Sequence, residues 1–583
     1  MANPLVSDRN VEFLLYELAR AEDLTALPYF SEHSRETFDL VLASARKLAR
    51  EQLFPAFKPM DDEPPRLENG QVRIHPAMRE LWPRMFEMGL GTATRPAEVG
   101  GQQLPRTVAV LAAHYCMAAN GAAMGYLGLT TGAAHLIEAF GDEFLKREFM
   151  TRMYAGEWAG TMALTEPDAG SSLADVRTRA RPQADGTFRI DGNKVFISGG
   201  DQDLTANIVH LTLARIEGAP AGIKGVSLFA IPKKRPDGSD NDCACAGVFH
   251  KMGWRGLPSI ALNFGERGEC RGWLVGEPNL GISYMFQLMN DARLMVGLNA
   301  ASTASAAYFE ALEYARTRPQ GRSLNARDPA SPQVPIMQHA DVRRMLLKQK
   351  AIVEGALALL VTCARYADLA KHGDDRHRAQ LLLDVLTPVA KSFPAERGFE
   401  ANALSVQVHG GYGYTSEYLP EAWLRDQKLN TIHEGTTGIQ SLDLLGRKVV
   451  AEGGAALVAL NEEIESAIER ATAARVEPGW IDAVRRAAAV VRDVTMLLAS
   501  KGLSGDRDGM MLHSFDYLDL FGTVVIAWQW LLQAAAAKEG RDDRFYRGKL
   551  AAAQYWINAE LPRVDYLAKL IADGEDSYAA DWF

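Results

Sequence analysis

The spacing of apolar residues changes twice along the chain, and this change limits the fold more than any other feature of the sequence. In residues 35–54, RETFDLVLASARKLAREQLF, apolar side chains recur at the period of a helix. From about residue 160 to about residue 280 the period falls to two, which is typical of half-buried strands. The helical period then returns. The chain is therefore predicted to be mainly α with a central β domain.

Several stretches of the central region are expected to be strands. Residues 188–198, FRIDGNKVFIS, are a hairpin candidate that turns at Asp191 and Gly192, because Asp-Gly is a favoured two-residue turn. NIVHLTLARI, GVSLFAIPKK and SIALNFGE follow as further strand candidates. Together they predict a compact antiparallel domain. The expected domain boundaries are 1–36, 37–159, 160–280, 281–449 and 450–583.

Composition narrows the class of protein. The 583 residues are 47% apolar and 23% charged and carry a net charge of −10, so the chain can bury large cores and has no basic nucleic-acid arm. Residues 451–583 hold fourteen Lys and Arg against 21 Asp and Glu, a net charge of −7. The five cysteines have no disulfide or zinc pattern and are expected to be reduced thiols in a cytoplasmic protein. No metal site is expected.

Two apolar stretches could be interpreted as a signal peptide or a membrane span. The N-terminal segment has Val11, Leu14, Leu15 and Leu18 at helical spacing and lacks the features of a signal peptide, so we expect it to join the fold. The run Phe521–Ala537 approaches the length of a membrane span, but it contains glutamines and has no basic flanks. A buried bundle helix is the favoured interpretation.

Three glycine-containing motifs carry the chemistry. In TIHEGTTGIQ, residues 431–440, the carboxylate of Glu434 lies in a tight turn where its direction can be fixed and its backbone N–H can donate, which suits a base. In TEPDAGSS, a turn at Gly170 and Ser171 can approach a phosphate, although an ordinary polar turn has the same composition. HGGYGY, residues 409–414, lacks the strand and helix of a Rossmann motif, so NAD binding of that type is rejected.

These motifs together resemble the flavin-dependent acyl-CoA dehydrogenases. The resemblance rests on MALTEPDAGSSLADV, QVHGGYGYTSEYLPEAWLRD and IHEGTTGIQ, which occur in the family's order and cover most of residues 40–447. It implies a helical N-terminal domain, a middle β domain and a C-terminal four-helix bundle. The N-terminal helix, the ARTRPQGR segment and the helical extension after residue 450 resemble the longer subgroup that includes 3-methylmercaptopropionyl-CoA dehydrogenase.

The resemblance implies FAD as the cofactor and a homodimer or larger homo-oligomer. Thr165 and Ser171 match residues that contact the flavin ring and the pyrophosphate, and Phe196 and Ser198 match an aromatic residue over the ring and a hydroxyl near its N5. Without the family, Phe196 would be interpreted as strand core. Arg318, Gln407 and Gly411 match residues that reach FAD across a subunit interface. The remaining residues expected at the cofactor are Met162, Leu164, Gly170, Thr436 and Gln440.

The family's chemistry gives Glu434 its role. A thioester α-proton is a weak acid, so its removal needs a base and stabilisation of the carbonyl oxygen together. By resemblance Glu434 takes this proton, its own N–H holds the thioester oxygen, and the β-hydride goes to flavin N5, which gives a trans-2-enoyl-CoA. Burial with substrate is expected to raise the pKa of Glu434. Arg293, His433, Gly435 and Ser171 are the expected substrate contacts.

The sequence departs from the family's pattern at two positions and leaves several alternatives open. Ser172 stands where the family usually has aspartate, which removes a charge and alters the local hydrogen bonding expected there. Gly438 stands where many relatives have glutamine, so part of the adenine contact is either missing or supplied by Gln440. The implied electron acceptor is an electron-transfer flavoprotein, with an oxidase as the competitor. The alternatives are a DNA-binding homologue with little turnover and a membrane-associated enzyme. The substrate is either 3-methylthiopropionyl-CoA or a fatty acyl-CoA; Gly125, Gly128 and Gly132 either open room for an acyl chain or let helices pack closely.

Overall fold

The computed structural model describes residues 3–326, 328, 330–540 and 543–582. Its internal contacts divide the chain into two units. The first comprises Met1–Asp39, Pro105–Ala118 and Arg293–Phe583, and the second comprises Leu40–Leu104 and Ala119–Ala292. Two long helices carry the chain from one unit into the other: α5 (Arg106–Phe140), whose backbone is not helical at Asn120, and α8 (Gly281–Thr317).

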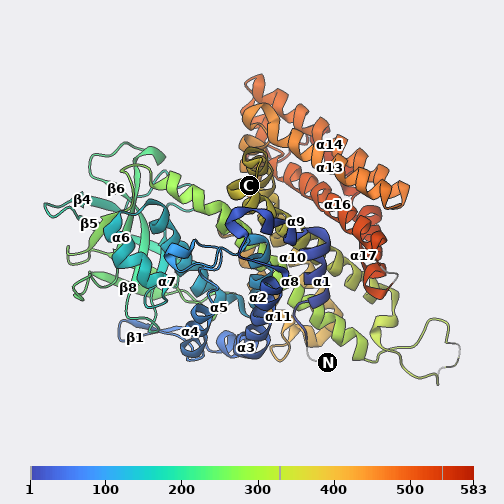
Figure 1. Ribbon diagram of the computed structural model, residues 1–583, viewed down its shortest axis with the longest axis horizontal. Coiled ribbons are helices and arrows are strands. Elements are labelled where there is room, and N and C mark those ends of the chain that lie inside the picture. The colour runs from blue at the N-terminus through green and yellow to red at the C-terminus, as the bar shows by residue number, and fades with distance from the viewer. Residues whose placement is uncertain (1–2, 327, 329, 541–542, 583) are drawn as a thin grey trace. The chain divides into compact units, whose positions relative to one another are not determined.

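The second unit holds the sheet predicted for the middle of the chain (Figure 1). The strands follow the order β10-β7-β6-β4-β5-β9-β8, and β3 lies beside β6. Because β10 also pairs with β5, the strands between them close into a ring. The strands are β3 (Ala159–Ala163), β4 (Arg179–Pro182), β5 (Phe188–Ser198), β6 (Ile208–Ile216), β7 (Val226–Pro232), β8 (Cys243–Val248), β9 (Ser259–Phe264) and β10 (Arg271–Leu274).

Two expectations for this sheet are corrected. It is not wholly antiparallel, because β6 pairs in parallel with both β3 and β4. The predicted turn at Asp191 and Gly192 is wrong, because β5 runs through both residues and Asp191 pairs with Arg179 of β4. Gly192 is needed there for close approach, since a Cβ atom at this position would lie 2.4 Å from Thr178 Oγ1. The glycine therefore serves strand packing and not a turn.

Short helices and a hairpin complete the second unit. Ile137 of α5 packs with Phe149, Met153 and the β6 residues Leu211 and Leu213 in one apolar core over the sheet. The remaining elements are α2 (Arg35–Leu48), which begins in the first unit, α3 (Phe54–Asp62), β1 (Arg66–Glu68), β2 (Gln71–Arg73), α4 (Met78–Glu87), α6 (Glu143–Leu145) and α7 (Thr151–Tyr154).

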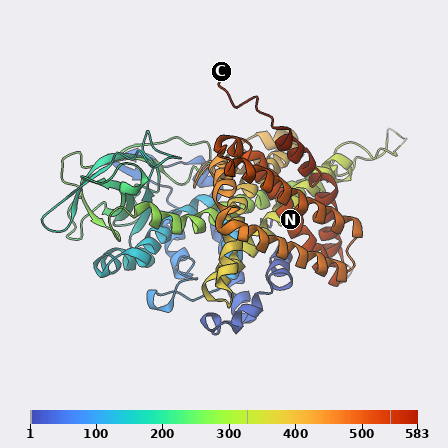
Figure 2. The same ribbon diagram turned by 90° about the horizontal axis from the view of Figure 1, so that it is seen from above.

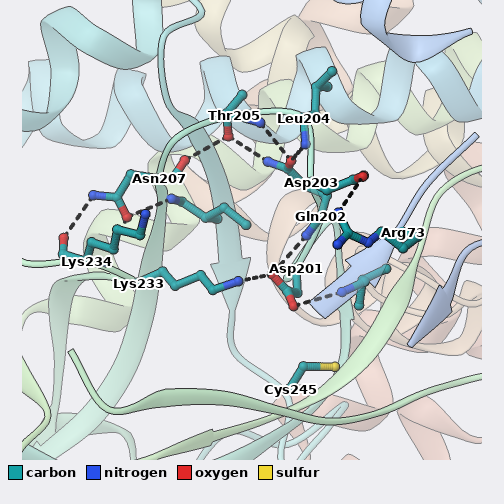
Figure 3. A network of polar contacts seen from close by, with 12 residues as sticks. Arg73, Asp201, Gln202, Asp203, Leu204, Thr205, Asn207, Lys233, Lys234 and Cys245 are labelled. Carbon is teal, nitrogen blue, oxygen red and sulfur yellow. Dashed lines mark hydrogen bonds and ion pairs between the residues drawn. The ribbon is translucent and has the colours of Figure 1, made fainter. Parts of the chain in front are cut away.

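The loop after β5 is held by charged side chains (Figure 3). Asp201 accepts a hydrogen bond from the N–H of Val72 in β2 at 3.2 Å and pairs with Lys233. Asp203 accepts from the N–H of Ile74 at 3.2 Å and from Arg79 at 2.8 Å. These bonds fix the backbone immediately after Ser198, where the sequence places one side of the flavin site.

The first unit is helical, as predicted. Helices α9 (Ala340–His372) and α10 (Arg376–His409) lie side by side and are mostly buried along their length. Short helices α11 (Pro420–Lys428) and α12 (Thr437–Asp443) follow. The N-terminal segment forms α1 (Asp8–Glu12) and a π-helical turn at Phe13–Leu18, with Val11, Leu14 and Leu15 buried, so it joins the fold as expected.

The C-terminal extension is a further layer of helices, in which α13, α14 and α16 lie side by side (Figures 1 and 2). Its helices are α13 (Ala455–Ala473), α14 (Pro478–Leu503), α15 (Arg507–Met511), α16 (Ser514–Glu539), α17 (Arg544–Tyr555) and α18 (Arg563–Asp573). All five cysteines lie in the described residues, and none of them forms a disulfide.

In the part of the chain that the structure describes, two helical segments are long and apolar enough to cross a membrane, Arg106–Phe140 and Arg507–Glu539. The most apolar windows of these segments are 72% and 94% buried, as is typical of core helices. The run Phe521–Ala537 lies in α16, and its Gln529 and Gln533 are fully buried. It is thus a buried helix, in agreement with its interpretation from the sequence.

Candidate active site

The Glu434 turn lies between a short 3-10 helix, Leu429–Thr431, and α12. Glu434 and Gly435 are both left-handed, with φ of +54° and +86°, and the Thr436 side chain caps α12 by accepting from the N–H of Ile439. A left-handed residue with a side chain is strained by roughly 1–2 kcal/mol, so this conformation persists only where the surroundings impose it. The turn therefore holds one carboxylate in a fixed direction.

The side chain of Gln440 supports the backbone of this turn. Gln440 is fully buried, and its Nε2 donates to the carbonyls of Glu434 at 3.1 Å and Gly435 at 3.4 Å. Among the residues that the structure describes, the N–H of Glu434 finds no acceptor. The turn thus leaves one donor beside the carboxylate, as the sequence suggested. The role of Gln440 and Thr436 at FAD stays a prediction.

Charged groups from three helices surround the turn. Arg293 of α8 is 2% exposed and forms an ion pair with Asp443 of α12 at 2.7 Å. Lys391 of α10 is fully buried. Burial raises the pKa of the half-buried Glu434 above its ordinary value, although Arg293 and Lys391 act in the opposite direction. A raised pKa brings a carboxylate closer to the range in which a general base works at neutral pH.

His433 lies beside an amide cluster. Its Nε2 is 3.4 Å from Asn430 Oδ1, and Asn299 Nδ2 donates to the same oxygen at 3.0 Å. Asn430 is fully buried, and Asn430 Nδ2 donates to Gln427 at 3.4 Å. These contacts hold the segment that leads into the Glu434 turn. The role of His433 as a substrate contact stays a prediction.

Arg318, Gln407 and Gly411 lie at the surface of the first unit. Gln407 and Gly411 flank the end of α10, and Arg318 follows α8. The two helix ends are joined by the stacked rings of Tyr314 and His409, whose centroids are 4.4 Å apart. The fold therefore places these three predicted cofactor residues at the same end of the bundle, exposed as an intersubunit site would require.

The predicted flavin residues Met162, Leu164 and Thr165 lie at the end of β3 in the second unit. The N–H of Val195 in β5 donates to the Thr165 carbonyl at 3.0 Å, which brings Thr165 beside Phe196. Met162, Leu164 and Thr165 are half-buried, and Gly170 and Ser171 are exposed. Thr165 thus lies beside β5, and a Cβ built on Gly170 would lie 3.9 Å from Thr165 Cγ2.

A bulge in β5 turns Phe196 outward. The pairing of β5 with β9 shifts between Lys194 and Ile197, and Phe196 has a φ of +58° and is 63% exposed. The interpretation of Phe196 as strand core is therefore wrong, because the bulge re-aims the side chain. The ring of Phe249 packs 4.6 Å from it. The exposed ring of Phe196 and the half-buried ring of Phe249 beside a threonine fit the flat, apolar face of a flavin ring.

A buried ion pair that the sequence did not suggest holds this strand to the TEPDAGSS motif. Lys194 Nζ is fully buried and donates to Glu166 at 2.8 Å and to the Leu164 carbonyl at 3.0 Å. Burial lowers the pKa of Lys194 to about 8, against the effect of Glu166. A signal existed in the sequence, because alternation along β5 places Lys194 on the inward face with Ile190.

The chain belongs to the acyl-CoA dehydrogenase family. Residues 35–157 match the N-terminal domain of acyl-CoA dehydrogenase, 161–266 its middle domain and 279–449 its C-terminal domain. Residues 460–580 match the domain described as acetyl-CoA dehydrogenase C-terminal like. The predicted family and fold, with the additional C-terminal helical domain, are confirmed. The finer division of the chain into five parts stays a prediction.

Two similar proteins match nearly the whole chain. It is 36% identical to 3-methylmercaptopropionyl-CoA dehydrogenase of Ruegeria pomeroyi over 98% of each chain, and 33% identical to the broad-specificity linear acyl-CoA dehydrogenase FadE5 of Mycobacterium tuberculosis over 95% of each. A solved acyl-CoA dehydrogenase of Bacillus anthracis in complex with FAD shares the fold, with a TM-score of 0.75 and 20% identity, covering 95% of this chain and 90% of that one. The predicted class, an FAD-dependent acyl-CoA dehydrogenase, is confirmed, and the DNA-binding alternative gains no support.

Proposed function

We propose that Glu434 is the base that removes the α-proton of a bound acyl-CoA. The observation that carries the proposal is the left-handed Glu-Gly turn, which fixes the carboxylate and leaves its own N–H without an acceptor in the described part of the chain. A carboxylate and a donor on one residue can take the proton and stabilise the negative charge on the thioester oxygen. Bound FAD would supply the acceptor for the β-hydride.

The residues of this chain would divide the remaining work. Thr165, Ser198 and the ring pair of Phe196 and Phe249 would hold the flavin ring, and Ser171 would hold the pyrophosphate. Arg293, tied to Asp443, would orient the CoA end of the substrate or fix the Glu434 turn from α8. Gln440 would keep the turn in place while Glu434 changes its charge.

The test uses Glu434→Gln, which keeps the shape of the side chain and removes the base. We expect the purified variant to hold FAD and to be yellow, while anaerobic bleaching of the flavin by acyl-CoA falls by at least about 10²-fold. Stopped-flow absorbance measures this rate. Bleaching at the wild-type rate would remove Glu434 from the mechanism.

For the substrate we propose either 3-methylthiopropionyl-CoA or a linear acyl-CoA, because the two similar enzymes carry these names. Gly128 and Gly132 of α5 face open space, since no atom lies within 4 Å of a Cβ built on either, whereas Gly125 packs within 2.8 Å of Leu257. Room for an acyl chain would thus lie at the first two glycines. Bleaching rates for acyl-CoAs of increasing length and for 3-methylthiopropionyl-CoA would rank the candidates.

We also propose an electron-transfer flavoprotein as the acceptor, a cytoplasmic location and a homodimer or larger assembly. The exposed Arg318, Gln407 and Gly411 support the assembly, because they would complete an FAD site of another subunit. Light scattering of wild type and Arg318→Ala, with FAD content measured for each, tests this. Steady peroxide production without an added acceptor would favour an oxidase instead.

A further inference from the structure

Lys391 is a buried cation in the C-terminal half of the chain. It lies in the middle of α10, is 0% exposed, and its Nζ has no partner among the described residues. Burying an ammonium group is costly unless opposite charges compensate for it. Pro394, four residues after Ala390, has no N–H for the Ala390 carbonyl. The backbone of Gly297 in α8 comes so close to this carbonyl that a Cβ at Gly297 would lie 1.9 Å from its oxygen. Close packing by α8 therefore covers the turn of α10 that carries Lys391.

Three charged groups act on Lys391, and each comes from a different part of the first unit. They are Glu396 from the same helix, Glu434 from the turn before α12, and Arg293 from α8. Burial lowers the pKa of Lys391 to about 8, while Glu396 and Glu434 oppose this shift and Arg293 adds to it. The groups that act on Glu434 are Arg293 and Lys391.

The other members of this cluster already have partners. Arg293 bonds to Asp443, which also pairs with Arg447 at 2.7 Å, and Glu396 accepts a hydrogen bond from the Thr437 hydroxyl. Of Arg293 and Lys391, the two cations that act on Glu434, Lys391 is the one without a bonded carboxylate among the described residues. Its charge is therefore available to the Glu434 carboxylate.

A charge count decides whether this ammonium group attracts an anionic acyl group or acts on the Glu434 carboxylate. Arg293, Asp443 and Arg447 together carry one positive charge, and Lys391 with the two carboxylates that act on it, Glu396 and Glu434, carries one negative charge. This site has no excess of positive charge to attract an anionic acyl group. When Glu434 takes a proton, Lys391 still faces Glu396, so the buried ammonium is not left without an opposite charge.

We propose that Lys391 is a positioning residue whose buried ammonium keeps the Glu434 carboxylate charged and directed into the site until Glu434 receives the substrate proton. The inference rests on the proposed role of Glu434 as the base. Removal of the ammonium would leave Arg293 alone to oppose the effect of burial on Glu434, so Glu434 would hold its proton to higher pH and be a base over a narrower range.

The experiment compares K391M, K391R and the matched control K448M in the FAD-bound enzyme. Lys448 is also mostly buried, but it pairs with Asp384 at 3.1 Å and is not among the groups that act on Glu434. One readout is the pH profile of anaerobic flavin bleaching. The other is an infrared pH titration of the protonated carboxyl band, assigned to Glu434 by its loss in E434Q, which needs no turnover.

We expect K391M to move the acid limb and the infrared midpoint upward by about one unit or more, as the loss of a nearby opposite charge does. K391R should stay close to wild type, and K448M should not move. Coincident titrations of K391M and K448M would overturn the proposal. An equal shift in K391R and K391M would do the same, because lost packing and not lost charge would then be the cause.

The design separates this inference from the proposed function. If none of the acyl-CoAs tested bleaches the flavin of the wild-type enzyme, the proposed function fails. The infrared titration of Glu434 still tests the role of Lys391 in that case. If K391M does not fold, K391M/E396Q removes the ammonium together with one of its carboxylates and should show the same upward shift. The absence of a shift in that variant would also reject the role of Lys391.

Discussion

At the scale of single residues, backbone strain coincides with the predicted chemistry. Among the non-glycine residues predicted for the site, Glu434 and Phe196 have positive φ, +54° and +58°. The sequence predicted a tight turn at Glu434 because glycine follows it, but it gave no sign that Phe196 sits on a bulge. A bulge depends on the register of β5 against β9, which is a long-range property. Local patterns therefore found the residues and missed how one of them is presented.

Lys194 and Glu166 provide a prediction at the residue scale. Lys194→Met leaves Glu166 buried with only the N–H groups of Arg177 and Thr178 and the Thr178 hydroxyl as donors. Because a buried carboxylate without its cation is strongly unfavourable, we expect a loss of about 3–5 kcal/mol. Urea denaturation measures this loss.

The double variant K194M/E166Q is the control for this pair. It removes the buried charge as well as its partner, so more than half of the stability should return. Retention of FAD should fall in K194M, because the Leu164 carbonyl loses its donor. A K194M protein as stable as wild type would show that the donors of Arg177 and Thr178 alone satisfy Glu166.

At the scale of elements, the helices and most strands followed from periodicity, while their ends and partners did not. Strands β6, β7 and β9 lie where alternation placed them. The parallel pairing of β6 with β3 and β4 joins segments far apart in the sequence, so no local pattern could show it. Similarly, Asp368 of α9 caps the start of α5 by accepting from the N–H groups of Arg106 at 2.8 Å and Thr107 at 2.9 Å.

The Asp368 cap makes stability depend on pH. Burial raises the pKa of Asp368 to about 6 from an ordinary value of 3.8, against the effect of its hydrogen bonds. The folded chain therefore holds this proton more tightly than the unfolded chain. The contribution to stability is fully present below the unfolded pKa and is lost as the pH rises through about 6.

Asp368→Asn tests whether the contribution of Asp368 to stability is lost as the pH rises. Because asparagine does not titrate, the free energy of unfolding of wild type should fall relative to that of D368N by about 2–3 kcal/mol between about pH 4 and about pH 7. Denaturation of both proteins across this range gives the difference. Parallel stability curves would mean that Asp368 keeps its ordinary pKa in the folded protein.

At the scale of the whole molecule, the order of the domains followed from the sequence, but the contacts of the C-terminal extension did not. Lys549 of α17 is fully buried and pairs with Glu354 of α9 at 2.8 Å, and it donates to Asn10 near the other end of the chain. Trp530 of α16 donates to the Ala351 carbonyl at 3.0 Å. These bonds join residues more than 170 positions apart in the sequence. The extension is thus part of the core of the first unit and not an appended arm.

Gly355 of α9 shows how closely the extension packs, and it gives a prediction at this scale. A Cβ at Gly355 would lie 2.8 Å from Ile526 Cγ2 and 2.9 Å from Trp530 Nε1 of α16, whereas a Cβ at Gly548 of α17 would lie 3.7 Å from its nearest neighbour, Lys350. Alanine in place of glycine favours a helix by up to about 1 kcal/mol, but overpacking costs about 1–3 kcal/mol.

The two substitutions should therefore have opposite signs. Gly548→Ala should raise the melting temperature, because the gain in helix propensity meets no clash, and Gly355→Ala should lower it, because α16 must move away from α9. Differential scanning fluorimetry of the two variants beside wild type measures both shifts. An equal rise in both would mean that α16 yields freely at Gly355, and the extension would then be a loosely held layer. A fall confined to Gly355→Ala would show that the extension and α9 unfold as one body, since strain at their contact would lower the stability of both.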